Sequence, residues 1–347
     1  MNRICTSLSQ AGYTCVLVGR VLPDSRPVTE HPYIQKRLKC WFHRGPLFYL
    51  EYNLRLFLFF LFLPVDTICS IDADTVGAGL LAARLRRKNH VFDAHELFTE
   101  VPEVANRKTV KKLWGWLQKL AFRHTDKAYT VGSELAQWFT NTYHVQVEVV
   151  RNAPLLSRQI PWEPDTERFI LYQGALNAGR GLEAMLQAMC VLNCKLVLAG
   201  EGDLSLKLRK MASDLGVTDK VQFLGFVPPA ELPALTARAW IGLNVSENAG
   251  LSYYLSLNNK FFDYVHAGLP SLINPFPEYK RLLTECEVGI LTEAHPNDLT
   301  KNATLLLTNE ELHRKLRLNC NLAAQKWNWE QESLRLLDIY GNLKNGQ

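Results

Sequence analysis

The sequence predicts an α/β protein of two domains, each built on a parallel sheet. Short β-branched and apolar runs alternate with helical patterns along most of the chain, and this alternation is typical of strand–helix–strand units. The length of 347 residues and the hydrophobic content of 47% suit two domains with a core each. A polar segment with prolines, 155–168, predicts the linker. We therefore place an N-terminal domain at 1–154, a second domain at 155–325 and a C-terminal helix at 326–347.

The elements expected in the first domain begin with a helix rather than a strand. Because a domain of this kind normally opens with a strand, we expect the native chain to begin about ten to twenty residues upstream of Met1. The alternative is that the domain folds with a smaller sheet and an open edge. The polar residues from Arg20 to Gly45 predict a long irregular connection. We expect helices at Asn2–Gln10, 47–63, 76–87, 108–123 and Ser133–Tyr143, and strands at Thr14–Val18, 66–71, His90–Ala94, 127–131 and 147–150.

Two of these helices have features of segments that bind a membrane surface. The stretch 47–63 is the most apolar in the chain, but Glu51 and Arg55 interrupt it before the about 20 apolar residues that a spanning helix needs. It predicts either a buried helix packed on a sheet or a helix dipping into a membrane surface. The basic helix 108–123 carries tryptophans as well as lysines, which suits a lipid interface or a solvated face with Trp in the core.

The composition limits the kinds of binding partner and the cellular compartment that we expect for the protein. The balance of 39 Lys+Arg against 34 Asp+Glu gives a net charge of +5, which is too mild to predict a nucleic-acid partner. The eight cysteines form no metal-site spacing, since the closest two, Cys190 and Cys194, have no second pair nearby. They indicate buried thiols in a reducing cytoplasm. The first residues lack the apolar segment of a cleavable signal peptide.

Polar residues follow two predicted strands of the first domain. Asp72-Ala73-Asp74 resembles a short metal-binding acid pair, although such pairs are common at strand ends. His95-Glu96 follows the next strand, and Thr99 occupies the position where a zinc protease motif would need its second histidine. His95 is thus either a functional histidine at a strand end or a satisfied one at a domain edge.

The second domain repeats the alternation and adds a short helix that follows a glycine-containing loop. Strands are expected at Phe169–Tyr172, Lys195–Ala199, 221–224, Ala239–Leu243 and Ser271–Ile273. Helices are expected at Leu182–Met189, after Asp203 as far as Leu215, and from Asn258 or Asn259 to Gly268. Further helices are expected from Asp298 on, and the last of them is Gln331–Tyr340.

Two stretches of this domain predict a phosphate site. The glycines of the turn Gly174–Gly181 let the backbone approach a diphosphate, and Arg180 adds a forked donor. The helix that starts near Asn259 offers unpaired N–H groups and the positive end of its dipole, beside the charge of Lys260. Asp263, one turn further on, suits sugar hydroxyls better than a phosphate. The alternative is an ordinary strand–loop–helix with solvated charges.

These residues also carry a family resemblance. Glu247, Gly250, the block Asn259–Tyr264 and Ala267-Gly268-Leu269-Pro270 resemble the donor-binding region of retaining glycosyltransferases with the GT-B fold, of the family-four (group 1) type. The resemblance covers most of the chain from Phe92 to Pro270. It implies two Rossmann-like domains facing a cleft, with the final helix crossing back to the first domain. The family usually has two Glu at closer spacing, whereas here fifteen residues separate Glu247 from Asp263.

The resemblance also implies roles for single residues. Asp263 would hold the ribose of the donor and Glu247 its sugar. The segment 93–103 resembles an acceptor-side loop, in which His95 would lie near the reacting sugar. The donor-binding set is then Gly174, Arg180, Phe226, Val227, Asn259, Lys260 and Asp263, with backbone at Phe226 and Val227 on the base, and the catalytic pair is His95 and Glu247.

The expected function is transfer of a sugar from a nucleotide-sugar donor to the hydroxyl of a glycan or lipid-linked acceptor, in cell-surface polysaccharide or glycolipid synthesis. Neither a cofactor nor a metal is expected, because protein cations would stabilise the leaving diphosphate. The protein is expected in the cytoplasm, with peripheral contact to the inner face of the membrane. A nucleotide-sugar epimerase of the same architecture and a non-catalytic nucleotide-sugar-binding protein are the alternatives.

Overall fold

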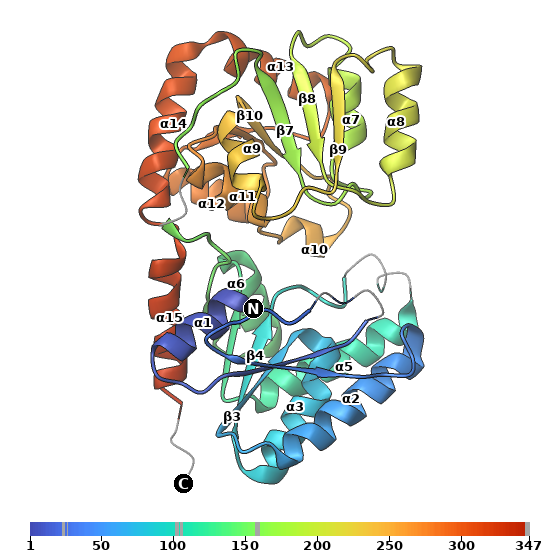
Figure 1. Ribbon diagram of the computed structural model, residues 1–347, viewed down its shortest axis with the longest axis vertical. Coiled ribbons are helices and arrows are strands. Elements are labelled where there is room, and N and C mark those ends of the chain that lie inside the picture. Colours follow the sequence, from blue (N-terminus) through green and yellow to red (C-terminus); the bar gives the residue numbers. More distant parts are fainter. Residues whose placement is uncertain (23–24, 26, 101–103, 105–106, 157–159, 344–347) are drawn as a thin grey trace. The chain divides into compact units, whose positions relative to one another are not determined.

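The computed structural model describes residues 1–22, 25, 27–100, 104, 107–156 and 160–343. Contacts divide the chain into two compact units (Figure 1). Unit 1 comprises Met1–Arg151 and the segment from Glu332 on, and unit 2 comprises Asn152–Gln331. Each unit contains a parallel sheet with helices packed on it, as the alternation of apolar runs and helical patterns predicts.

The main sheet of unit 1 has four parallel strands in the order β3-β4-β5-β6. The fully buried run from Val91 to Ala94 shows why this segment is a central strand: parallel strands covered on both faces are continuously apolar. The polar exception inside it, Asp93, is fully buried. The elements are β3 (Thr67–Ile71), α3 (Asp72–Arg86), β4 (Asn89–Ala94), α5 (Lys108–His124), β5 (Lys127–Thr130), α6 (Ser133–Tyr143) and β6 (Glu148–Val149).

The start of unit 1 differs from the prediction. The helix α1 (Asn2–Gln10) is confirmed, but the connection predicted as irregular contains a strand, β2 (Ile34–Leu38), which pairs in parallel with β1 (Val16–Arg20). The prediction was wrong because β2 reads Ile-Gln-Lys-Arg-Leu, and no residue in it is fully buried. A strand with two solvated faces has no apolar periodicity to reveal it.

The apolar segment of unit 1 forms α2 (Gly45–Phe62), and only one of its faces is buried. Phe48, Tyr52 and Leu56 pack into a small core, whereas Leu54 on the opposite face is 55% exposed and Phe62 at the C-terminal end of the helix is 85% exposed. The helix is thus packed on unit 1 through one face and exposed on the rest, so the choice between a packed helix and one that dips into a membrane surface stays a prediction. In the described part of the chain, no helix has the combined length and apolarity to span a bilayer.

Unit 2 has a sheet of six parallel strands in the order β12-β11-β10-β7-β8-β9. From the adjacent strands β7 and β10, the sheet continues to β8 and β9 on one side and to β11 and β12 on the other. The topological switch point therefore lies between β7 and β10, and doubly wound proteins bind ligands at this point. The strands are β7 (Phe169–Gln173), β8 (Lys195–Ala199), β9 (Val221–Gly225), β10 (Ile241–Asn244), β11 (Ser271–Ile273) and β12 (Gly289–Leu291).

Helices of unit 2 hold this sheet and present its loops. On α11, Phe261, Phe262 and Val265 are buried in a cluster with Tyr279 and Trp327, which anchors the helix through its apolar side. Neither α9, α10 and α12 nor strand β12 was predicted, because each has nine residues or fewer and so shows little periodicity. The helices are α7 (Leu182–Ala188), α8 (Ser205–Asp214), α9 (Leu232–Arg238), α10 (Leu251–Tyr254), α11 (Asn259–His266), α12 (Pro277–Glu285), α13 (Pro296–Thr308) and α14 (Glu310–Ala324).

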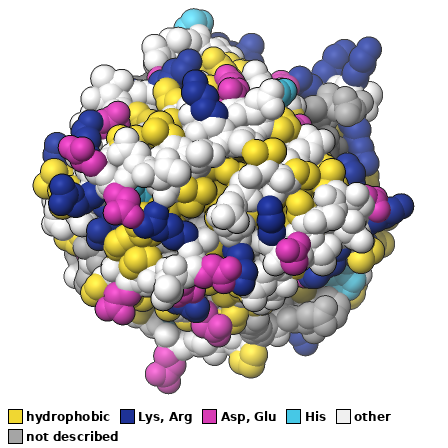
Figure 2. All heavy atoms as spheres, turned by 90° about the horizontal axis from the view of Figure 1, so that it is seen from above, with side chains coloured by type: hydrophobic (Ala, Val, Ile, Leu, Met, Phe, Trp, Pro, Cys, Tyr) yellow, Lys and Arg dark blue, Asp and Glu magenta, His cyan; other side chains and the backbone are white. Residues whose placement is uncertain are grey.

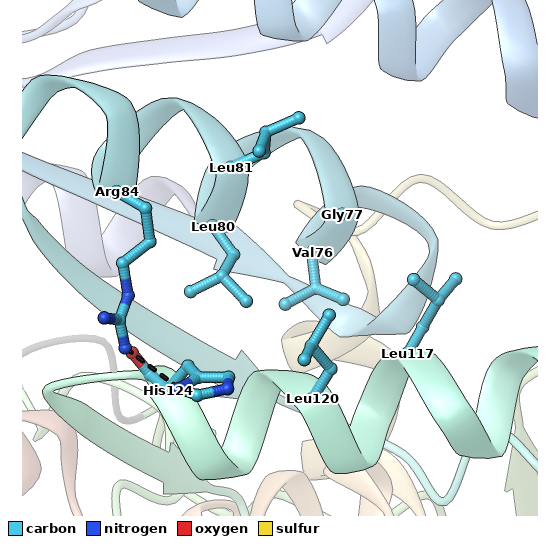
Figure 3. Close-up of a pocket in the computed structure, with 8 residues that line it drawn as sticks. All are labelled: Val76, Gly77, Leu80, Leu81, Arg84, Leu117, Leu120 and His124. Carbon is cyan, nitrogen blue, oxygen red and sulfur yellow. Dashed lines mark hydrogen bonds between the residues drawn. The ribbon is translucent and has the colours of Figure 1, made fainter.

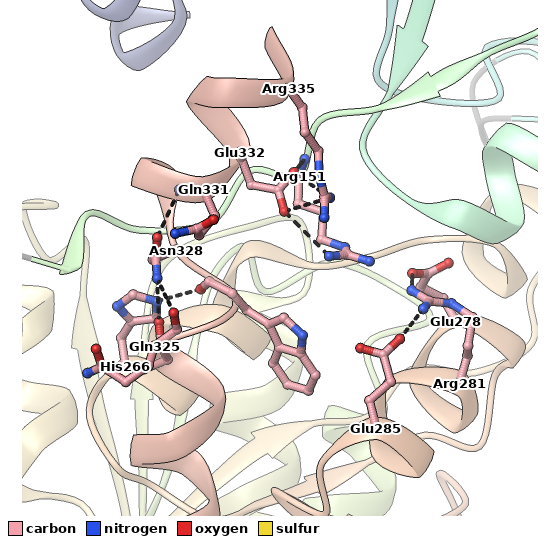
Figure 4. A network of polar contacts seen from close by, with 12 residues as sticks. Arg151, His266, Glu278, Arg281, Glu285, Gln325, Asn328, Gln331, Glu332 and Arg335 are labelled. Carbon is pink, nitrogen blue, oxygen red and sulfur yellow. Dashed lines mark hydrogen bonds and ion pairs between the residues drawn. The ribbon is translucent and has the colours of Figure 1, made fainter. Parts of the chain in front are cut away.

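The last helix, α15 (Trp329–Gly341), begins in unit 2 and continues in unit 1. At its start the Asn328 side chain accepts a hydrogen bond from the Gln331 N–H at 3.0 Å. Within unit 1 the buried carboxylate of Glu332 accepts from the Arg151 N–H at 2.9 Å and from the guanidinium of Arg335 at 3.2 Å (Figure 4). A buried acid with such partners fixes the ends of the chain segments that enter and leave unit 1.

Candidate active site

Two loops of unit 2 meet beside the switch point of its sheet. The Glu247 N–H, after β10, donates to the Gly179 carbonyl at 2.9 Å, in the loop after β7. The glycines there are required: Gly174 has a φ of +135°, and a Cβ on Gly200 would lie 1.9 Å from the Gly174 carbonyl oxygen. The glycine-rich turn predicted from the sequence is therefore a backbone approach that larger residues would prevent.

Lys260 lies at the N-terminal end of α11 and is buried. Its ammonium sits 3.8 Å from the centroid of the Tyr172 ring, a cation–π arrangement. Burial lowers the pKa of Lys260 well below its ordinary value, and the charge of Arg180 lowers it further. Among the described residues, no carboxylate lies within ion-pair distance of this ammonium. The site thus holds a buried amine that no carboxylate of the described residues pairs.

Arg180 completes this cationic group. Its guanidinium lies 4.9 Å from the centroid of the Tyr253 ring, and Nη1 donates to Asn258 Oδ1 at 3.5 Å. Asn258 is the N-cap residue of α11, yet its side chain makes no capping bond and instead donates to Asn244 at 3.2 Å. The arginine, the buried lysine and the N-terminus of α11 therefore gather in one place, as the sequence predicts.

A residue of strand β7 orients the Asp263 carboxylate by a hydrogen bond. Gln173, the last residue of β7, donates its amide Nε2 to Asp263 Oδ2 at 2.9 Å. The Gln173 Oε1 accepts from the Thr236 hydroxyl at 2.8 Å, and this bond fixes the amide orientation. A carboxylate oriented in this way is suited to accept hydrogen bonds from hydroxyl groups.

The other predicted donor residues lie around this group with fewer contacts. Asn259 is exposed, and its Oδ1 accepts from Asn152 at 2.9 Å. Glu247 is exposed on the loop after β10. Beyond β9, the Phe226 side chain is 63% exposed, whereas Val227 packs against a buried cluster that includes Tyr264.

Unit 1 has a second group of polar side chains, around His95. The His95 Nε2 lies 3.1 Å from Asp93 Oδ1, and the Tyr129 hydroxyl donates to Asp93 Oδ2 at 2.9 Å. Burial alone lowers the pKa of His95, but the hydrogen bond and charge of Asp93, with the charge of Asp72, outweigh it and raise the pKa. The acids around His95 therefore favour its protonated form. The loop that follows includes 101–103, which lie outside the described residues.

The sequence analysis missed several residues of both groups. Asp93 and Gln173 are polar residues at the ends of buried strands, and this pattern could have revealed them. Tyr172 and Tyr253 gave no such signal, because an aromatic residue in a strand or short helix is ordinary. Asn258 was predicted only as a helix cap.

The structure also shows features outside these two groups. In the described ranges, no three His, Cys, Asp or Glu side chains cluster as a metal site requires. A hollow of about 280 Å³ lies between α3 and α5, lined mainly by Val76, Leu80 and Leu120, with Arg84 beside His124 at one end (Figure 3). On the face shown in Figure 2, cationic, anionic and apolar side chains are interspersed.

Family models match both units. The model described as "Glycosyl transferases group 1" matches residues 156–327, and the model described as "Glycosyltransferase Family 4" matches residues 1–153. An uncharacterised glycosyltransferase of Methanocaldococcus jannaschii is 43% identical over 67 residues, which are 18% of this chain and only 17% of that protein.

A longer match joins the chain to a Campylobacter jejuni α-1,4-N-acetyl-D-galactosaminyltransferase that acts on an undecaprenol-linked glycan. It is 23% identical over 78% of this chain and 74% of that protein. Among solved structures, sucrose-phosphate synthase from Thermosynechococcus elongatus superposes with a TM-score of 0.80 at 17% identity, over 98% of this chain and 91% of that one. Anabaena HepE in complex with UDP and glucose has a TM-score of 0.74 at 16% identity, over 90% and 87%. These likenesses establish the GT-B fold.

Proposed function

The chain belongs to the group 1 glycosyltransferases of the GT-B fold, and we propose that it moves a sugar, with retention of configuration, from a nucleotide-sugar donor to a hydroxyl acceptor. The bond from the anomeric carbon to the diphosphate oxygen breaks, a bond to the acceptor oxygen forms, and the hydroxyl proton leaves with the diphosphate. The observation that carries the proposal is the buried Lys260 beside Arg180 at the N-terminus of α11, with no carboxylate partner among the residues that the structure describes.

The cationic group would bind and stabilise the diphosphate. A buried amine without a carboxylate partner is poorly solvated as a cation, and a diphosphate would supply the missing negative charge. As the anomeric bond breaks, charge develops on the diphosphate, and fixed cations nearby lower the barrier without reorganising. Arg180 adds bidentate hydrogen bonds from a position held by Asn258. These residues do the work that a divalent metal would do elsewhere.

The nucleoside would lie beyond the diphosphate. Asp263, oriented by Gln173, would accept from the ribose hydroxyls, and the backbone of Phe226 and Val227 would contact the base. Glu247 would hold the donor sugar. Because HepE is described in complex with UDP and glucose, a uridine diphosphate sugar is the first donor to test.

The acceptor would be a glycan or a lipid-linked glycan, with His95 beside the reacting hydroxyl. The Campylobacter relative acts on an undecaprenol-linked glycan, which supports a role in polysaccharide or glycolipid synthesis. The His95 side chain is 27% exposed, and its Nε2 lies 3.1 Å from Asp93 Oδ1. Its ring is therefore both accessible and oriented for a polar acceptor.

A surface of unit 1 supports the proposal that the protein acts at the cytoplasmic face of a membrane. The helices α2, α3 and α5 pack side by side and form what we name the three-helix layer (Figure 1). Every Asp and Glu on these helices is at least partly buried, whereas four lysines and arginines of α5 are exposed. Anionic lipid attracts such a surface, and exposed apolar residues enter the interface. The exposed apolar residues are Leu47, Leu50, Leu54, Leu58, Phe62, Leu81, Leu85, Leu113 and Trp116.

The deciding experiment is turnover of a panel of nucleotide sugars by purified protein. Thermal shift first selects the donor, because a ligand at about 100 times its dissociation constant adds roughly 2.7 kcal/mol. Transfer to a hydroxyl acceptor in excess chelator, with the anomeric configuration kept in NMR spectra, is the expected result. Isomerisation of the donor in the absence of an acceptor would indicate an epimerase. Donor binding without turnover would indicate a non-catalytic binding protein. Turnover that chelator abolishes and manganese restores would indicate a metal-dependent enzyme.

A further inference from the structure

The polar group of unit 1 includes a carboxylate that the family resemblance does not assign. Strands β3 and β4 are parallel neighbours, with Ile71 opposite Asp93. Asp72 follows β3 and His95 follows β4, so both lie at the carboxyl edge of the sheet, where such proteins place functional residues. The pairing therefore brings together two residues that are 23 positions apart in sequence.

Asp72 binds the backbone that carries His95. Its Oδ1 accepts from the His95 N–H at 2.8 Å and, more weakly, from the Glu96 N–H at 3.4 Å. Asp93 holds the same histidine by its ring, at 3.1 Å from Nε2. One carboxylate thus fixes the backbone of His95 and another fixes its imidazole, and together they leave the residue little freedom.

The backbone of Asp72 indicates that this contact is not incidental. Its φ is +54°, a left-handed conformation that is strained for a residue other than glycine. The preceding Ile71 is fixed on both sides by Thr75, whose hydroxyl accepts from the Ile71 N–H at 3.0 Å and donates to its carbonyl. Glycine would satisfy this turn without strain. Only a short acidic or amide side chain satisfies both the turn and the His95 N–H.

We propose that Asp72 is a positioning residue for His95: its carboxylate, presented by the left-handed turn between β3 and α3, ties the His95 backbone to the sheet edge and sets where the imidazole meets the acceptor. This role rests on the proposed acceptor-side function of His95. It differs from a metal role for Asp72 and Asp74, because it depends on the contact with His95 and not on a shared ion.

The charges in this group act on one another. Burial raises the pKa of Asp72 to about 7, against the lowering effect of His95. The groups that face the His95 ring are Asp93 from β4, Asp72 from the start of α3 and the amino group of Met1, which opposes protonation. Removing the charge of Asp72 therefore lowers the pKa of His95.

Three variants test the proposal. Asp72→Gly relieves the strained φ and removes the acceptor, Asp72→Asn keeps the acceptor and removes the charge, and Asp74→Asn is the matched control one half-turn along α3. For Asp72→Gly we expect kcat of transfer to fall at least about tenfold, with the donor dissociation constant unchanged. Asp72→Asn should recover most of kcat and move the acid limb of the pH profile to lower pH. Asp74→Asn should behave as the unsubstituted protein.

A second measurement does not depend on turnover. The ¹⁵N NMR signals of His95, identified among the nine histidines by their loss in His95→Gln, are titrated in each variant. A lower His95 pKa in Asp72→Asn, and a displaced His95 amide signal in Asp72→Gly, would support the proposal even if no donor is found and the proposed function fails. Unchanged His95 signals and kcat in Asp72→Gly, or equal losses in Asp74→Asn, would overturn it.

Discussion

The polar groups of the two units are built from ionisable side chains of opposite kinds. In unit 2, Lys260 and Arg180 gather at the N-terminus of α11. In unit 1, the carboxylates of Asp72 and Asp93 surround His95. In both units burial disfavours the charged form of the side chain. It therefore lowers the pKa of the base Lys260 and raises the pKa of the acid Asp72.

The difference lies in how each charge is satisfied. The His95 ring has an acid partner within the fold, because its Nε2 lies 3.1 Å from Asp93 Oδ1. Lys260 has an aromatic ring and a second cation as neighbours, and no carboxylate of the described residues pairs with it. A buried charge without a partner is costly. We infer that the unit 1 group is complete before substrate arrives, whereas the unit 2 group is completed by an anionic ligand.

The largest expected effect comes from removing the unpaired cation. Lys260→Met keeps the buried stem and removes the amine, so kcat/KM for transfer should fall by about 10²–10³-fold, the usual cost of losing one group that stabilises developing negative charge. The fold should persist, because no ion pair is broken. The control is Lys210→Met on the exposed face of α8. Unchanged kcat/KM in the first variant would show that the diphosphate binds elsewhere.

The next effect concerns the acid of unit 2. Asp263→Asn keeps the shape of the side chain and removes its charge, so donor binding should weaken by about 1.5–3 kcal/mol, the range for a charge-assisted hydrogen bond. Calorimetric titration with the donor measures it, with Asp214→Asn at the surface of α8 as the control. A donor affinity equal to that of the unsubstituted protein would remove Asp263 from the ribose role.

The pH dependence of donor binding sharpens the comparison. Because the pKa of Lys260 is lowered in the free protein and a diphosphate would raise it, binding takes up a proton between the two values. Donor affinity should therefore fall as pH rises through this window, by at most about tenfold per pH unit. Calorimetry in buffers of different ionisation enthalpy counts the protons, and Lys260→Met should show none. Proton release on binding contradicts the argument.

The smallest expected effect tests the three-helix layer. Lys111 is paired with Glu100 at 2.5 Å, so the exposed Lys112 is the better probe. Lys112→Gln should weaken flotation on anionic vesicles by about 1 kcal/mol, or roughly fivefold, and added salt should reduce the difference. Lys210→Gln on unit 2 is the matched control. If the unsubstituted protein does not float at low salt, the layer has another role.

The sequence by itself determined the class of fold and most elements of unit 2. Runs such as Lys195–Ala199 and Ser271–Ile273 coincide with strands because buried parallel strands are continuously apolar, a property of the local sequence. The grouping of Arg180 and Lys260 was predicted in the same way, since a glycine-rich turn and a helix start are local signals. Where the local signal was absent, as in β2, the prediction was wrong.

Only the tertiary structure decided which side chains hold these residues. Gln173 reaches Asp263 across 90 positions because β7 lies next to β10, and Asp72 reaches His95 because β3 lies next to β4. The order of strands in a sheet results from packing all helices on both faces at once, and no short stretch of sequence contains it. The sequence thus named most of the ionisable residues, and the sheets decided which side chains contact them.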